Sequence, residues 1–131
     1  MKTITKFIYF GFAALALGCF TFSPTPNAFG VVPAPDGGYA NFTTAEGTNA
    51  LLNLTAGAAN TGLGWSSLSS VSTGSFSTAV GAGALALNNA DSDTAVGAAA
   101  LLRNTGGTQN VAVGTATLVN NDTGDGNTAN G

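Results

Sequence analysis

The side chains of this sequence that could do acid–base chemistry are aspartates in its C-terminal half. They form two close pairs, Asp91 with Asp93 and Asp122 with Asp125. Paired carboxylates carry out glycoside hydrolysis, in which one acts as the acid and the other as the base or nucleophile. Both pairs, however, lie in segments rich in Gly, Ser, Thr and Asn, where Asp ordinarily bonds to the backbone of a turn. We therefore interpret all four as turn residues.

Most other reactive side chains are missing beyond residue 30. That part of the sequence has no His, Lys or Cys, so nucleophile–base pairs, zinc sites and Schiff bases all lack members. Calcium takes about six to eight oxygen ligands, and Asp122, Asp125 and Asn127 supply only part of such a set. We expect a protein that is not an enzyme and that needs no metal or cofactor.

The first 30 residues have the pattern of a secretory signal peptide. Two lysines precede an uncharged apolar stretch, and the small residues Ala28 and Gly30 follow at the −3 and −1 positions suited to cleavage. A second interpretation stays open, because residues 16–19 are similar to a bacterial lipobox and Cys19 would then be the lipidated N-terminus. Both interpretations predict a bacterial protein that is secreted or held at the outer cell surface. Membrane attachment is expected only if Cys19 is lipidated.

The chain from Val31 onward is acidic and poor in bulky residues. One arginine and six acidic residues give it a net charge of −5, so it has no basic surface for nucleic acid or an anionic membrane. Its aromatic residues are Tyr39, Phe42, Trp65 and Phe76. Trp65 stands alone in its position of the repeat: if exposed it could contact a partner, but a lone Trp more often packs beneath a loop or end cap, which is what we expect here. Such a chain must either stay disordered or repeat a thin structural unit.

A repeat of about 17 residues runs through the rest of the sequence. A glycine marks each unit, and a leucine follows four residues later. These residues are Gly47, Gly64, Gly81, Gly97 and Gly114, with Leu51, Leu68, Leu85, Leu101 and Leu118. The third unit is one residue short, and we place Asp91-Ser92-Asp93 in its turn. Stacked units would put leucine on leucine and so bury a continuous core.

The three residues before each glycine, such as Thr78-Ala79-Val80, predict a very short β-strand. Alternation along the strand puts the Thr and Val columns on one face and the alanine column on the other. We expect the Thr and Val columns to stack inside the coil. Flat threonine ladders can bind ice, but Val111 interrupts this one, which favours the internal position. The alanines, Ala79, Ala95 and Ala112, are then expected to form a small-residue face that contacts other copies.

These columns predict an all-β fold, a parallel β-solenoid of about five 17-residue coils. The expected domains are the signal peptide at 1–30, an N-terminal lead-in at 31–43 and the solenoid at 44–131. Helix is the first alternative, at residues 98–103, but Gly97 and Gly106 leave too few residues for a stable isolated helix. Disorder is the second alternative, which the in-phase leucine and valine columns disfavour.

The segments Thr78–Leu85 and Asn110–Gly114 resemble repeats in the heads of trimeric autotransporter adhesins of the YadA type. They also resemble repeats of related bacterial surface and tail-fibre-like proteins. The resemblance covers about residues 39–131 and implies a left-handed parallel β-roll, usually trimeric, that binds host matrix or other surfaces. The stalk and membrane barrel of those adhesins are missing here, and the sequence stops four residues into a sixth coil. We therefore expect either a fragment of a longer protein or a truncated reading frame.

Together these features predict a non-enzymatic surface protein, an adhesin-like head that attaches to surfaces or has a structural role. The expected partners are further copies of the chain, as a trimer, and an unidentified host or cell-surface macromolecule. The alternative is a subunit of a self-assembling extracellular filament.

Overall fold

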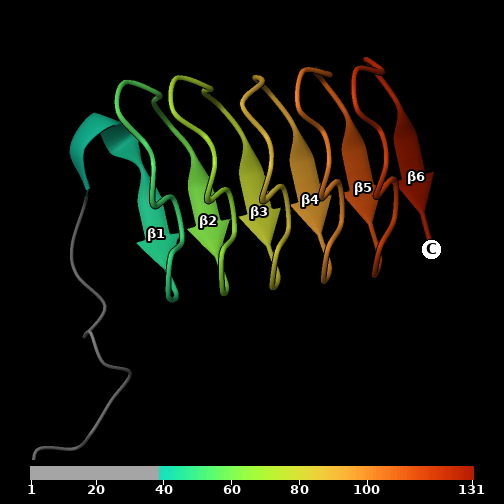
Figure 1. The fold of residues 1–131 in the computed structure, drawn as a ribbon, viewed down its shortest axis with the longest axis horizontal. Helices are drawn as coiled ribbons and strands as arrows, with labels where there is room; N and C mark the ends of the chain where they lie inside the picture. The colour runs from blue at the N-terminus through green and yellow to red at the C-terminus, as the bar shows by residue number, and fades with distance from the viewer. Residues whose placement is uncertain (1–38) are drawn as a thin grey trace, which may run out of the picture. The chain divides into compact units, whose positions relative to one another are not determined.

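The structure is a computed structural model and describes residues 39–131. The predicted signal peptide, Cys19 and residues 31–38 of the predicted lead-in lie outside the described residues. A 3-10 turn at Ala40–Phe42 precedes six short strands. The strands are β1 (Thr44–Glu46), β2 (Thr61–Leu63), β3 (Thr78–Val80), β4 (Thr94–Val96), β5 (Val111–Val113) and β6 (Thr128–Asn130). They form one sheet in chain order, and every neighbouring pair is parallel (Figure 1). The predicted parallel β-solenoid is therefore confirmed.

The strands stack in the register that the repeat predicts. Thr44 pairs with Thr61 in the first rung, and Thr94 pairs with Val111 in the fourth. The short third coil keeps this register, because Thr78 pairs with Thr94, sixteen residues later. The missing residue is therefore absorbed in a loop, and each column of the sequence becomes a ladder along the solenoid.

Left-handed backbone makes the turn that follows each strand. Gly81 has φ +130°, and a Cβ there would lie 2.7 Å from the carbonyl carbon of Gly97 in the next coil. Glycine is required because the coils approach so closely at this point. Four residues later, Leu85 has φ 51°, a conformation that costs an L-residue about 1–2 kcal/mol. Leu85 is fully buried, and the burial of its side chain offsets that cost.

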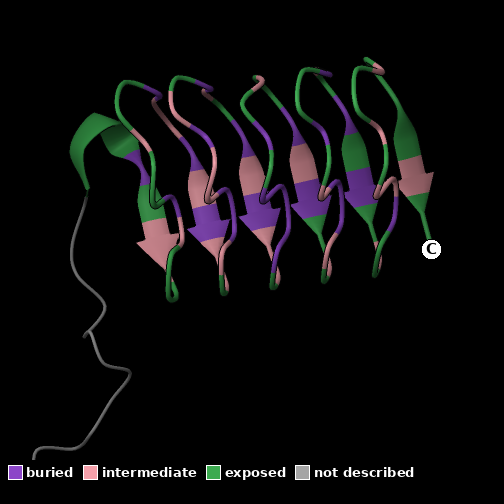
Figure 2. Ribbon diagram, in the orientation of Figure 1, coloured by how far each residue is buried: buried purple, intermediate pink, exposed green. Residues whose placement is uncertain are grey.

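The two faces of the strands are the reverse of those predicted. Ala79, Ala95 and Ala112 are fully buried in the core, whereas the valine and threonine columns face outward (Figure 2). The interior of a 17-residue coil is narrow, and leucines from the opposite wall already fill it. At Gly62, in the alanine column, even an added Cβ would lie 3.2 Å from Leu51 Cγ. Small residues are therefore needed inside, and the expected alanine contact between copies is wrong.

Half of the interior is polar. Its fully buried members include asparagines from two columns, and a serine and an aspartate take the asparagine's place in two coils. These residues are Asn60, Asn88, Asn104, Asn110, Ser77 and Asp93. Each asparagine bonds to a neighbouring coil or turn: Asn60 Oδ1 accepts from the Ser77 amide at 2.9 Å, and its Nδ2 donates to the Gly74 carbonyl at 2.7 Å. In residues 39–131 no buried side-chain polar atom lacks a partner, so the polar half is as fully bonded as a backbone ladder.

Candidate functional site

The glycines and leucines that mark the repeat form the scaffold of the solenoid. Leu51, Leu68, Leu85 and Leu101 are buried in one continuous cluster, and Leu118 packs against that cluster while partly exposed. The marker glycines all have φ between +125° and +133° at the ends of their strands. These residues hold the coils in register, and a site for a partner must be sought on the surface.

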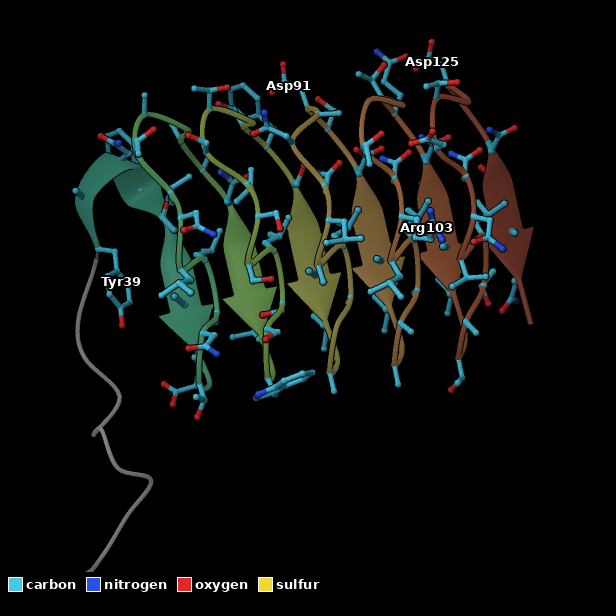
Figure 3. All side chains as sticks on the ribbon, viewed as in Figure 1. Tyr39, Asp91, Arg103 and Asp125 are labelled. Carbon is cyan, nitrogen blue, oxygen red and sulfur yellow. The ribbon has the colours of Figure 1, made fainter. Side chains whose placement is uncertain are left out.

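Three of the four candidate carboxylates bond to the turns of the preceding coil. Asp91 Oδ1 accepts from the Ser75 amide at 2.7 Å, and Asp125 Oδ1 accepts from the Thr108 amide at 2.6 Å. Asp122 accepts from the Thr105 hydroxyl. Figure 3 shows Asp91 and Asp125 on turns at the same edge of the solenoid. These contacts match the interpretation of the aspartates as turn residues.

Asp93 is the exception, because its side chain is fully buried. Oδ1 accepts from the Asn110 amide at 2.9 Å and from Asn110 Nδ2 at 3.2 Å, while Oδ2 accepts from Asn104 Nδ2 at 2.9 Å. Burial raises the pKa of Asp93 from 3.8 to about 6, although the bonds from both asparagines oppose the rise. The expected pair is therefore split: Asp91 is at the surface and Asp93 lies inside the coil. Asp93 does accept from a backbone amide, as interpreted from the sequence, but from inside the coil rather than from a surface turn.

The described residues offer little else for catalysis. Within 39–131, no three His, Cys, Asp or Glu side chains gather closely enough to hold a metal ion. A hollow of about 210 Å³ beside the first coil has a mixed lining of aliphatic, aromatic and neutral polar residues, among them Leu51, Leu54, Tyr39 and Asn41. Its lining has neither a carboxylate nor a basic side chain. No helix in the described part of the chain is long and apolar enough to span a membrane.

The outward surface of the sheet is the candidate site for a partner. We define the Thr/Val face by the outward residues of β2–β5. They are Thr61, Leu63, Thr78, Val80, Thr94, Val96, Val111 and Val113. Val96 is 38% exposed and Val113 41%, which is high for valine in a strand of a parallel sheet. Seven of the eight side chains are β-branched and stiff, so the face is regular, and none is charged.

Aromatic side chains form a second exposed feature. Trp65 is 61% exposed, so the prediction that it packs beneath a loop is wrong. Phe42 and Phe76 are exposed as well, at 93% and 68%. Large exposed aromatic residues are typical of binding surfaces rather than of folding cores.

The sequence contains a signal for the burial of Asp93 and a signal for the burial of the alanine column. Asp93 stands directly before Thr94, as Asn60 stands before Thr61, and this match puts Asp93 in the buried asparagine column. The columns of the strand alternate Thr, Ala and Val, and only the smallest of the three fits opposite a leucine in so narrow a coil. No protein-family model, curated protein or solved structure matches the chain.

Proposed function

We propose that this protein is an exported, non-enzymatic surface module of a bacterium, an adhesin-like head that mediates attachment. Two exposed features support this proposal: the Thr/Val face, a regular, uncharged and largely apolar surface left open on a single chain, and the exposed aromatic residues Phe42, Trp65 and Phe76. Surfaces of this kind mark contacts with other macromolecules. By contrast, the turns that carry Asp91, Asp122 and Asp125 are polar and negatively charged.

The Thr/Val face supports assembly of several copies of the chain. Its two columns repeat at the spacing of the rungs, about 4.8 Å, so equivalent faces can interlock along their length. Covering valine methyl groups stabilises the contact by about 25 cal/mol per Å² of apolar surface removed from water. The resemblance to trimeric heads favours three copies around a common axis. This proposal replaces the alanine face, which is buried within each chain.

The chemistry of the surface favours binding over catalysis. The exposed side chains are mainly short hydroxyl, amide and aliphatic groups, with isolated aspartates bonded to turns. The acidic balance disfavours nucleic acid, which binds to clustered Lys and Arg. We infer a host or cell-surface macromolecule as the partner that attachment requires.

A filament subunit is the second candidate. Every rung has the same parallel register, so a rung from another copy could continue the same ladder through its open backbone groups. Long fibres in electron micrographs of the purified chain would favour this candidate over the adhesin-like head.

Two experiments on the full chain test the proposed function: one detects its export to the cell surface, and the other measures its adhesion. Expressed in a bacterial host, the chain is expected to reach the medium or the outer surface, where an antibody detects it on intact cells. Beads coated with the purified chain should adhere to cell layers or extracellular matrix more than beads coated with serum albumin. Retention of the chain inside the cell, or equal adhesion of the two kinds of beads, would contradict the proposal.

A further inference from the structure

The aromatic residues of the described chain all lie on the surface. Tyr39, Phe42, Trp65 and Phe76 are exposed, while the core is built from alanine, leucine, valine and asparagine. In most proteins aromatic side chains dominate the core, because each buries so much apolar area. Here they contribute little to the interior, and their placement indicates contact with a partner.

Phe42 and Phe76 belong to one column of the solenoid and are separated by Ala59. Backbone bonds fix this column: the Ala59 amide donates to the Asn41 carbonyl at 2.8 Å, and the Phe76 amide donates to the Ala58 carbonyl at 2.9 Å. The two phenylalanines therefore stand two rungs apart, roughly 10 Å along the axis at the usual strand spacing. The alanine between them leaves a gap in the column.

The backbone at both phenylalanines is unfavourable for a bulky residue. Phe42 has φ 58° and Phe76 has φ 62°, both in the left-handed region. Positive φ is uncommon for residues other than Gly, Asn and Asp. The same column holds glycine at Gly126, with φ 65°, so the coil does not need an aromatic residue there. The same conformation recurs in this column at Ala59 (φ 56°), Ser92 (φ 64°) and Gln109 (φ 60°), so the coil imposes it and the phenylalanines are placed where a smaller residue would suit the backbone better.

Polar side chains continue the column beyond the phenylalanines. Ser92 and Gln109 occupy the next two rungs, and both are exposed. The exposed carboxylates Asp91 and Asp125 are in the neighbouring column and repel an anionic ligand. We call this column, Phe42, Ala59, Phe76, Ser92 and Gln109, the aromatic track. Along the solenoid it presents two aromatic rings, then a hydroxyl and a side-chain amide, with the two aspartates in the column beside it.

We propose that this track binds a neutral, extended β-1,4-linked glycan that lies along the solenoid axis. One disaccharide of such a glycan is about as long as two rungs, so every second sugar ring can stack on an aromatic side chain. Phe42 and Phe76 supply the apolar surfaces, Ala59 leaves room for the intervening ring, and Ser92 and Gln109 bond to hydroxyl or acetamido groups. The proposal rests on the attachment function and names the class of its partner.

Titration of the full chain with oligosaccharides tests this assignment. The probes are the hexamers of β-1,4-linked N-acetylglucosamine and β-1,4-linked glucose, with the α-1,4-linked glucose hexamer as the control for linkage. Calorimetry is expected to show binding of at least one β-linked probe and much weaker binding of the α-linked one. Phe42→Ala and Phe76→Ala should each lower the affinity about tenfold, the loss of one stacked aromatic contact.

Two further variants separate binding from folding. Phe76→Gly removes the ring and suits the positive φ, so its melting temperature should equal or exceed that of the parent while the affinity falls. Leu52→Ala removes an exposed side chain from another column and should leave the affinity unchanged.

Three outcomes would overturn the glycan assignment: no binding of either β-linked probe, equal binding of the α-linked probe, or full affinity in both phenylalanine variants. A proline decamer is included as a rival ligand, and its binding in place of the glycans would assign the track to an extended peptide. Coated beads that still adhere to surfaces under any of these outcomes leave the attachment function standing. Beads that fail to adhere although the oligosaccharides bind contradict that function alone.

Discussion

Asp93 is a buried carboxylate in a column where other coils have asparagine or serine. Its two oxygens accept hydrogen bonds from Asn104 and Asn110, and these bonds link neighbouring coils through the interior. Burial nevertheless disfavours the charged form, because the narrow coil excludes water from the carboxylate. The result is a single titratable group in the middle of the solenoid that is linked to folding.

Stability should fall as the pH rises through the range in which Asp93 ionises. The pKa is about 6 in the folded protein against 3.8 as the ordinary value, so the folded state holds the proton more tightly. The extra stability is then fully present below about pH 4, is lost between about pH 4 and 6, and stays lost above that range. The loss is on the order of 2–3 kcal/mol. Urea unfolding at pH 4.5 and 7.5, followed by circular dichroism, measures it.

Two substitutions at Asp93 separate charge from hydrogen bonding. Asp93→Asn removes the charge and matches Asn60 and Asn110 in the same column, so it should flatten the pH dependence, although its Nδ2 can no longer accept from Asn104 Nδ2 as Oδ2 does. Asp93→Ala leaves the buried Asn110 amide without an acceptor and should cost about 1–3 kcal/mol. An unchanged pH profile in Asp93→Asn would show that another group is responsible.

At the scale of the single coil, the buried leucine packs against the buried alanines of the strands and so fills the core. Leu85→Ala should lower the free energy of unfolding by about 2–5 kcal/mol, because Leu85 is fully buried in the third coil. Alanine already takes the same kind of backbone at Ala99 and Ala116, so the loss measures packing rather than conformation. Urea unfolding of the parent and the variant checks it.

Leu87→Ala is the matched control for the leucine column. Leu87 lies two residues further along and is 47% exposed, so its truncation should cost far less. Equal losses in the two variants would mean that the leucine column does not form the core.

The period of the repeat was enough to predict the coils, the short strands and their parallel register. It did not predict which face of each strand is buried. Alternation shows that Thr78 and Val80 share a face, but only the width of the coil decides that Ala79 points inward. That width depends on the opposite wall, in particular on leucines in a left-handed conformation, which a pattern of apolar residues does not reveal.

The position of Asp93 was missed for a related reason. The third coil is one residue short, and its acidic run resembled a surface turn. The structure keeps the column and shortens the loop instead, since a hydrogen bond between adjacent coils holds Asp93 beside Asn110 in the same column. From the sequence, an aromatic residue such as Trp65 could be recognised as unusual in its column, but whether its side chain is exposed could not be predicted.

At the scale of the whole molecule, the proposed assembly follows from the reversal of the two faces. Alanine and leucine close the interior of each chain, and the Thr/Val face remains for other copies. The aromatic track borders that face, because Phe76 stands two residues before Thr78. The proposed association must therefore leave this edge of the sheet uncovered for a partner. We thus assign assembly of copies to the Thr/Val face and attachment to a partner to the aromatic track.

Thiol labelling at neighbouring positions of β4 tests this account most directly. Ala95→Cys and Val96→Cys are each introduced with Cys19→Ser, so that each variant has one thiol. The Ala95→Cys variant is expected to resist labelling at every protein concentration, because position 95 is inside the coil. The Val96→Cys variant should react quickly when dilute and become protected as the concentration rises and copies associate. Rapid labelling at position 95 in the folded protein, or a rate at position 96 that does not change with concentration, would contradict the account.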